Sequence, residues 1–319
     1  MRDDSCVTTS DAEKPGFILS APPGQRRAIV ELARELEQRD FPHVLCPHEY
    51  ARPHDIPAPY DCLSLCTAVI QATERIRVAS GVAVTYTRHP TDMAAAASFN
   101  HELSEGRFFL GLGSGYKSVL ERYGITVERP IPHMRRYIRE MREAAVEQPL
   151  PPVLFAALRG KMAALGWELA DGIIGGNWAL SHVPQTLAGI PESKREGFIV
   201  GNVAPLYLCD DRAEGLAFMR RLCAAFARIP TYASYFAEAG YGDEIAGAQV
   251  AFEAGDSRAA AASISERMAE DVGIFGSPTE IQERVAEWRA AGVNWITLST
   301  LYPSKDRVGA VREAAAVFD

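Results

Sequence analysis

The sequence has no apolar run of the roughly 18 residues that a membrane-spanning helix needs. Its first residues are polar and mixed in charge, without the apolar centre of a secretory signal peptide. Lysine and arginine total 33 against 41 aspartates and glutamates, and the net charge is −8. The basic residues form no stripe along the chain. We therefore expect a cytoplasmic protein with neither a membrane nor a nucleic acid among its partners.

Motifs of several enzyme and metal-site classes are also missing. There is no GxSxG nucleophile elbow, no P-loop and no HExxH zinc motif. The six cysteines include no CxxC pair, and although Cys62 and Cys66 can share one helix face, no second pair completes a zinc site. We expect free buried thiols in a reducing compartment and no metal. A Schiff-base aldolase is disfavoured because Lys117 and Lys161 fall in loops or at helix starts.

The sequence does contain a regular alternation of short apolar runs and longer segments with helical spacing. The short runs are bounded by turn residues, so they indicate buried strands. We expect strands at residues 16–21, 43–46, 75–84, 107–112, 152–157, 171–175, 198–208 and 293–299. In most of the longer segments apolar residues recur every three or four positions, which indicates helices that cover a sheet.

Eight strands alternating with helices in 319 residues predict a single (β/α)8 TIM barrel. An open, doubly wound sheet is the alternative fold with the same alternation. We expect residues 1–14 to be a flexible tail and residues 15–319 to form the barrel. Residues 211–275 are too long for one barrel helix, so we expect a helical insertion there, between the seventh and eighth strands. The last helix opens with SPTE at residues 277–280, a capping box with proline at the first helical position.

Two of the predicted strands end in glycine-rich segments, at residues 111–116 (GLGSGY) and 175–178 (GGNW). The functional site of such a barrel lies at the C-terminal ends of its strands. Small residues there let backbone N–H groups approach a phosphate or a planar ring. Each segment can equally be a tight turn between a strand and a helix. The first has GxGxG spacing and so differs from the GxGxxG of a Rossmann fold.

The predicted second strand is followed by His48 and Glu49. A histidine and a carboxylate at a strand end can supply and orient a proton, and the alternative is a solvated loop. A metal is disfavoured here, because the spacing of His48 with His54 and Asp55 matches no standard ligand motif.

The predicted third strand is followed by Tyr86, Arg88 and His89. Arg88 can hold an anion and His89 can titrate near neutral pH. The alternative is that Arg88 pairs with a carboxylate while His89 only begins the next helix. The residues themselves leave both interpretations open.

The run Arg88-His89-Pro90, an alanine-rich helix and then SEGRFFLGLGSGY at residues 104–116 resemble the central signature of the bacterial-luciferase-like oxidoreductases. Further similar segments follow in the family's order, at residues 151–158, 170–178 and 275–293. The resemblance extends from residue 16 to about residue 317.

This resemblance implies a barrel with a helical insertion before the last strand, and a cofactor that is either FMN or the deazaflavin coenzyme F420. It implies a cis peptide bond between Gly81 and Val82, in support of the cofactor ring. Tyr86 and Arg88 become candidates for substrate binding. The phosphate and ring contacts it implies are those of Gly113, Ser114, Gly115, Tyr116, Gly175, Gly176, Asn177 and Trp178.

The sequence departs from the family after the second strand. Many members carry an acidic residue followed by histidine, whereas here His48 precedes Glu49. Both are therefore candidate catalytic residues, each able to supply or orient a proton. The loop before the fifth strand is also shorter than is common in the family, which predicts a more open substrate pocket.

Three functions follow from these expectations. The first is a reductase that transfers a hydride from reduced F420 to a small imine, alkene or carbonyl substrate. The second is an FMN-dependent monooxygenase that receives reduced flavin from a separate reductase. The third is a flavin-binding protein without catalysis. The family often forms dimers, which makes a homodimer a candidate assembly, and the sequence identifies neither the oligomeric state nor the substrate.

Overall fold

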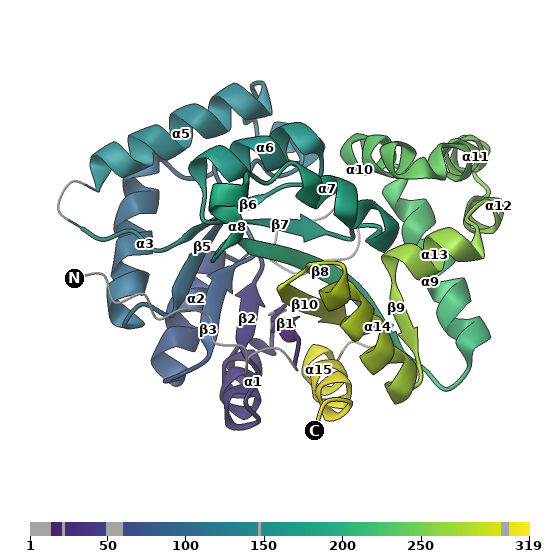
Figure 1. Cartoon of the computed structure of the whole chain (residues 1–319), viewed down its shortest axis with the longest axis horizontal. Coiled ribbons are helices and arrows are strands. Elements are labelled where there is room, and N and C mark those ends of the chain that lie inside the picture. The colour runs from purple at the N-terminus through teal and green to yellow at the C-terminus, as the bar shows by residue number, and fades with distance from the viewer. Residues whose placement is uncertain (1–13, 21–22, 49–59, 146–147, 301–305) are drawn as a thin grey trace.

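The computed structural model describes residues 14–20, 23–48, 60–145, 148–300 and 306–319. Within these residues, the barrel strands are β1 (Gly16–Ile18), β2 (His43–Cys46), β3 (Arg77–Ser80), β5 (Phe108–Gly113), β6 (Val153–Ala156), β7 (Gly172–Gly176), β8 (Ile199–Leu208) and β10 (Trp295–Thr300). Neighbouring strands are parallel, and β10 pairs with both β1 and β8 (Figure 1). The sheet therefore closes into the predicted eight-stranded barrel.

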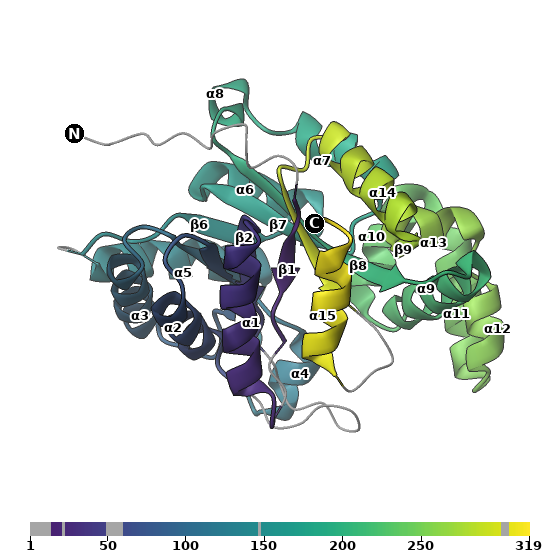
Figure 2. The same cartoon turned by 90° about the horizontal axis from the view of Figure 1, so that it is seen from below.

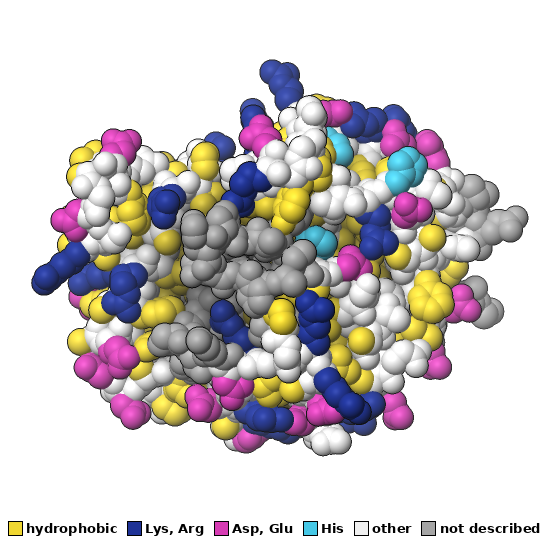
Figure 3. Space-filling model, turned by 180° about the vertical axis from the view of Figure 1, so that it is seen from behind, with side chains coloured by type: hydrophobic (Ala, Val, Ile, Leu, Met, Phe, Trp, Pro, Cys, Tyr) yellow, Lys and Arg dark blue, Asp and Glu magenta, His cyan; other side chains and the backbone are white. Residues whose placement is uncertain are grey.

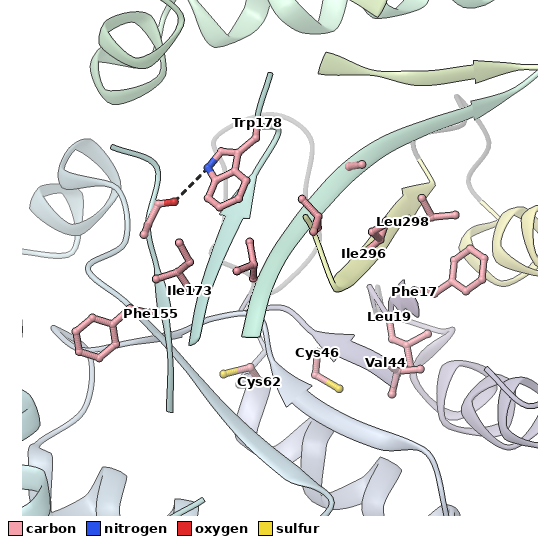
Figure 4. Packing of buried hydrophobic residues seen from close by; sticks show 14 of the residues in the cluster. Phe17, Leu19, Val44, Cys46, Cys62, Phe155, Ile173, Trp178, Ile296 and Leu298 are labelled. Carbon is pink, nitrogen blue, oxygen red and sulfur yellow. Dashed lines mark hydrogen bonds between the residues drawn. The ribbon is translucent and has the colours of Figure 1, made fainter. Parts of the chain in front are cut away.

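Side chains of each barrel strand alternate between two buried faces. Toward the barrel axis, one cluster joins residues of six strands: Leu45, Ala79, Leu154, Ile174, Ile199 and Trp295. On the outer face, Val44, Phe155 and Ile173 belong to the larger core between the strands and the helices (Figure 4). Because both faces are buried, these strands appear in the sequence as continuous apolar runs, and this is why they were predictable.

A ring of helices covers the barrel. Its members are α1 (Arg26–Gln38), α2 (Cys62–Ala72), α3 (Pro90–Leu103), α5 (Pro130–Ala144), α6 (Gly160–Leu169), α7 (Val183–Ala188), α14 (Pro278–Ala290) and α15 (Arg307–Ala316). Helix α1 shows the principle, because it buries Ile29, Leu32, Ala33 and Leu36 along one stripe. Shorter helical turns complete the loops: α4 (Lys117–Arg122), η2 (Leu180–His182) and α8 (Glu192–Arg195).

The predicted insertion lies between β8 and β10. It consists of α9 (Arg212–Phe226), α10 (Pro230–Phe236), the π-helical turn η3 (Ala237–Tyr241), α11 (Gly242–Glu253), α12 (Ser257–Ala262), α13 (Glu266–Val272) and β9 (Ile274–Gly276). Figure 2 shows its helices gathered on one side of the barrel. The strand β9 was not predicted; it pairs with the last residues of β8, which at ten residues is longer than the other barrel strands.

The predicted third strand is divided. β3 ends at Ser80, the two-residue β4 (Ala83–Val84) pairs with β5, and the intervening Gly81–Val82 peptide bond is cis, as the resemblance implies. The predicted capping box of α14 is confirmed: the Ser277 amide donates a 2.8 Å hydrogen bond to Glu280 Oε2, and the Ser277 hydroxyl caps the Glu280 amide.

Four further expectations concern the surface, the N-terminal tail and the cysteines. Among the described helices, none combines the length and the apolar character that crossing a membrane requires. On the face shown in Figure 3, acidic and basic side chains are interspersed, which agrees with the mixed charge of the sequence. Of the expected tail, residues 1–13 lie outside the described residues. Among the described cysteines all are free, and the four at positions 46, 62, 66 and 223 are buried, as expected.

Candidate active site

The predicted cofactor segments meet at one edge of the barrel, because all its strands run in the same direction. Val84, at the end of β4, pairs with Gly113 at the end of β5. The Thr85 amide then donates a 3.0 Å hydrogen bond to the carbonyl oxygen of Gly113. On the other side of β6, Gly176 at the end of β7 pairs with Val203 of β8. The edge is thus lined by the segments that the sequence singled out.

Gly113 and the Gly81–Val82 segment form a cradle in which no added side-chain atom has room. A Cβ atom at Gly113 would lie 2.6 Å from Val82 Cγ2 and 3.2 Å from the Cβ atom of Ala156. At Gly81 it would lie 2.2 Å from the Leu45 side chain. Gly81 and Val82 are nevertheless partly exposed. The Val82 side chain therefore covers the buried Gly113, and the partly exposed Gly81–Val82 segment is the part of this cradle that a planar ring can reach at the barrel mouth.

The loop after β7 turns sharply at Asn177, whose φ of 57° lies in the left-handed region that asparagine tolerates better than most residues. Its amide donates a 2.9 Å hydrogen bond to the carbonyl oxygen of Val203. Its side-chain Nδ2 donates to the hydroxyl of Tyr232 at 3.2 Å. Gly176 and Asn177 are both partly exposed at the end of β7.

Trp178 lies beneath this loop. Its side chain is 1% exposed, and its Nε1 donates a 3.2 Å hydrogen bond to the carbonyl oxygen of Ala157 (Figure 4). The indole covers Gly175 so closely that a Cβ atom there would lie 2.0 Å from the ring. Trp178 therefore explains why residue 175 is glycine. Its contact with a cofactor stays a prediction, with no exposed ring to make it.

His48 follows β2 at the same edge and lies near a carboxylate that the sequence analysis did not single out. His48 Nδ1 is 4.0 Å from Asp61 Oδ1, and Arg88 donates a 3.1 Å hydrogen bond to that same oxygen. Asp61 also caps α2, accepting hydrogen bonds of 2.9 Å from the amide and the hydroxyl of Ser64. Glu49, the other candidate proton donor, lies outside the described residues.

This arrangement sets the charge states of the pair. Burial lowers the pKa of His48 from its ordinary 6.5, Asp61 acts to raise it, and Arg88 acts to lower it. Burial raises the pKa of Asp61, but the Ser64 hydrogen bonds and Arg88 outweigh that effect and hold it below its ordinary value. At neutral pH the site therefore contains an aspartate anion beside a largely neutral imidazole.

For the segment after β4, the structure shows the second of the two interpretations left open above, in which Arg88 pairs with a carboxylate and His89 begins the next helix. Arg88 pairs with the carboxylate of Asp61, and His89 Nδ1 caps α3 by accepting a 3.3 Å hydrogen bond from the Thr91 amide. Tyr86 stacks on His133, with ring centroids 3.8 Å apart. An open pocket of about 440 Å³ is lined by Tyr86, Arg88, His89 and His133, together with Thr85, Thr87, Pro90, Arg136, Tyr137 and Glu140.

Comparison with known proteins shows the family to which this barrel belongs. The luciferase-like monooxygenase family matches residues 14–294, which is most of the chain. The chain belongs to the luciferase-like monooxygenase family. It is thus an oxidoreductase of the luciferase-like class. The segments that carry its sequence signature lie at the mouth of its barrel.

Individual luciferase-like relatives are distant. The chain is 26% identical over 277 residues to a 5,10-methylenetetrahydromethanopterin reductase of Archaeoglobus fulgidus, covering 76% of this chain and 83% of the relative. It is 25% identical over 282 residues to a putative coenzyme F420-dependent oxidoreductase of Mycobacterium tuberculosis, covering 72% and 80%. A solved F420-dependent secondary alcohol dehydrogenase shares the fold with a TM-score of 0.70 at 14% identity, covering 96% of this chain and 99% of that one.

In this luciferase-like protein a third potential metal ligand joins His48 and Asp61. The ligand atoms of His48, Asp61 and Cys62 lie within 4.8 Å of one another. Three features oppose a cation there: the Arg88 guanidinium on Asp61, the N-terminus of α2, and burial, which raises the pKa of the Cys62 thiol. Arg88 and the N-terminus of α2 already balance the negative charge of Asp61, so this cluster is poorly suited to a metal ion.

Two parts of the site were missed by sequence reasoning. Asp61 was not singled out as a site residue because it follows a proline-rich segment. Its position directly before an apolar helical run is typical of an N-cap, and this signal was present in the sequence. Tyr232 belongs to the insertion, where no motif marks any residue. Its contact with Asn177 spans 55 residues of sequence and depends on how the insertion folds back on the barrel.

Proposed function

We propose that this protein is an F420-dependent oxidoreductase that exchanges a hydride with a small organic substrate at the barrel mouth. The observation that carries the proposal is the closely packed cradle of Gly81, Val82 and Gly113, at the same edge of the barrel as the Asn177 turn. The names of two of the proteins compared above, a relative of 25% identity and a structural neighbour, include F420. This support comes from likeness and from the fit of the residues.

The residues present fit such a coenzyme. The partly exposed Gly81–Val82 segment would face its planar ring, and glycine at position 113 leaves the room that the Val82 and Ala156 side chains occupy. The backbone of residues 113–116 and 175–177 would hold its phosphate, as the resemblance implies. When bound, the coenzyme supplies the hydride, and the protein supplies position and electrostatics.

In this proposal His48 handles the proton that accompanies the hydride. Burial and Arg88 lower its pKa, which makes its protonated form a stronger acid than an ordinary imidazolium. The Asp61 anion, 4.0 Å from the ring, favours the protonated form of His48 through its charge. Glu49 is the alternative proton donor. Tyr86 and Arg88 line the open pocket beside the site and would contact the substrate.

The reductase direction is tested with reduced F420 and a panel of imines, activated alkenes and carbonyl compounds. We expect turnover with at least one compound, and a loss of at least about 100-fold in His48→Gln, the usual range for removing a general acid. The same variant should bind F420 as the wild type does, because His48 is not part of the cradle. Unchanged turnover in His48→Gln would transfer the proton-donor role to Glu49 or to solvent.

The second candidate function is an FMN-dependent monooxygenase, favoured by the description of the matching family. Such an enzyme would receive reduced FMN from a separate reductase. The two functions differ in what they need beyond the phosphate: F420 continues into an acidic tail, whereas FMN ends there. Oxygen uptake with reduced FMN and no turnover of reduced F420 would favour the monooxygenase.

A further inference from the structure

Three tyrosines of the insertion hold the loop that follows β7. The Tyr232 hydroxyl accepts a 3.2 Å hydrogen bond from Asn177 Nδ2, and the Tyr235 hydroxyl accepts one of 2.9 Å from the Ala179 amide. Asp271 accepts hydrogen bonds from the Ser181 amide at 2.8 Å and from the Tyr241 hydroxyl at 2.6 Å. Alternate residues of the loop, at positions 177, 179 and 181, are therefore fixed by the insertion.

The contact between Tyr232 and Asn177 differs from the others in its position, because it lies next to both glycine-rich segments. The Tyr232 hydroxyl lies against Gly176 at the end of β7, since a Cβ atom at Gly176 would lie 3.1 Å from it. Tyr116 of the other glycine-rich segment is close enough that, after burial, it is the largest influence on the pKa of Tyr232, which lies well above its ordinary value. The hydroxyl thus stays protonated where the two glycine-rich segments approach each other.

The ring of Tyr232 is held from behind. It is 8% exposed and stacks on Phe226 of α9 with centroids 4.7 Å apart and ring planes 21° apart. Phe236 of α10, the helix that also carries Tyr232, packs against the ring as well, with ring centroids 6.1 Å apart. Because aromatic packing fixes the ring, the position of its hydroxyl is determined by the insertion and does not adjust to the loop.

We propose that Tyr232 is a positioning residue for the phosphate of the bound coenzyme. It orients the Asn177 side chain and fixes the Gly176–Asn177 backbone that would contact that phosphate. The helical insertion thereby controls cofactor affinity from outside the barrel. This inference rests on the proposed function, since it concerns the phosphate subsite of that same coenzyme.

The test compares ligands with and without a phosphate. The pairs are F420 with its phosphate-free deazaflavin chromophore, and FMN with riboflavin, each titrated by fluorescence against the full-length wild type and Tyr232→Phe. We expect Tyr232→Phe to weaken binding of the phosphorylated ligand by about tenfold, the usual scale of a lost hydrogen bond near a charged group, while the phosphate-free partner binds as before. A purely structural role for Tyr232 would weaken both ligands of a pair alike.

Two further variants sharpen the result. Asn177→Gly keeps the left-handed backbone but removes Nδ2, so we expect the same selective loss, with no further loss in the double variant. Tyr235→Phe removes the neighbouring contact to Ala179 and serves as the matched control, with wild-type affinity for all four ligands. Thermal unfolding of each variant shows that the fold is retained.

The outcomes separate this inference from the proposed function. If the wild type prefers the phosphorylated ligand and Tyr232→Phe keeps that preference, the inference is overturned and the proposed function stands. The inference is overturned in the same way if Tyr235→Phe shows an equal loss of preference. If the wild type binds none of the four ligands, the proposed function fails, and the inference fails with it.

Discussion

The carboxylate of Asp61 accepts a 3.1 Å hydrogen bond from Arg88, which lies 27 residues further along the chain. Because Asp61 caps α2 and Arg88 precedes α3, this contact ties two barrel loops together at the mouth of the barrel. His48 lies 4.0 Å from the same carboxylate and therefore feels both charges. The two charges act on its pKa in opposite directions.

Asp61→Asn should lower the pKa of His48 further, because it removes the negative charge that raises it. If protonated His48 is the proton donor, the rate of reduction falls as pH rises through this pKa, so the variant's decline begins at a lower pH. The pKa itself is measured by NMR titration of the imidazole. His48→Gln identifies its signal among those of the seven histidines.

Arg88→Gln is the matched control for that experiment. Arg88 lowers the pKa of His48, so its removal should raise the pKa. Asp61 keeps its charge in this variant because the Ser64 hydrogen bonds remain. Shifts of the same sign in both variants would show that His48 does not sense this pair of charges.

Gly113→Ala should destabilise the protein and damage the cradle. The added methyl group would lie 2.6 Å from the Val82 side chain and 3.2 Å from that of Ala156, so the atoms around it must shift. Overpacking of this kind costs about 1–3 kcal/mol, measurable by urea unfolding. We also expect a clear loss of cofactor affinity in the titrations described above.

Gly160→Ala provides the comparison for Gly113→Ala. Gly160 begins α6, and no atom lies within 4 Å of the position that its Cβ would take. Alanine there should leave stability unchanged or raise it by less than about 1 kcal/mol, with cofactor binding unaffected. Equal losses of stability and of cofactor affinity in the two variants would show that the limited space around Gly113 is not their cause.

His43 should make the fold less stable in acid. It is buried at the opposite end of β2, with Nε2 hydrogen-bonded to Thr297 Oγ1 at 2.9 Å. Burial, followed by Arg77 and Arg289, lowers its pKa well below 6.5. Below pH 6.5 the unfolded chain binds a proton at this residue that the folded protein excludes, so stability falls as pH decreases.

The measurement for His43 is urea unfolding at pH 7.5, 6.5 and 5.5. His43→Gln keeps a hydrogen-bonding side chain but does not titrate. Its loss of stability below pH 6.5 should be smaller than that of the wild type by up to about 1.4 kcal/mol per pH unit. Identical pH profiles would mean that His43 is protonated in the folded state as readily as in the unfolded chain.

Ser277→Ala tests a feature visible in both the sequence and the structure. It removes the hydroxyl that caps α14 while Glu280 remains. Loss of such a cap costs about 1 kcal/mol. Ser234→Ala, which removes a hydroxyl bonded only to the preceding turn of α10, should change the unfolding free energy by less than about 0.5 kcal/mol.

Much of the fold was predictable because the barrel strands are buried on both faces and the helices carry one apolar stripe. Predicted and observed bounds agree to within about two residues for most strands, and His43–Cys46 agrees fully. The exceptions are the first strand, which ends at Ile18 and not at residue 21, and the third, which is divided at Gly81–Val82. The elements that were not predicted are short. α4 has only six residues, and β9 has three whose pairing depends on how far β8 extends beyond the barrel.

The site was less predictable than the fold. Glycines at strand ends can be found by inspection, and the structure brings Gly113 and Gly176 to one edge. Which side chains meet there is a matter of tertiary contact. Asp61 reaches Arg88 and Tyr232 reaches Asn177 across segments without periodic signal, so neither pair is visible before the chain is folded.

The central claim is that the barrel mouth binds a deazaflavin, and fluorescence titration of the purified protein with F420 and FMN, each oxidised and reduced, tests it most directly. We predict micromolar or tighter binding of F420, with FMN bound more weakly, and loss of F420 binding in Gly113→Ala but not in Gly160→Ala. Tight FMN binding with weak F420 binding would contradict the proposed cofactor. Binding of neither at micromolar concentration would mean that the glycine-rich strand ends are turns alone.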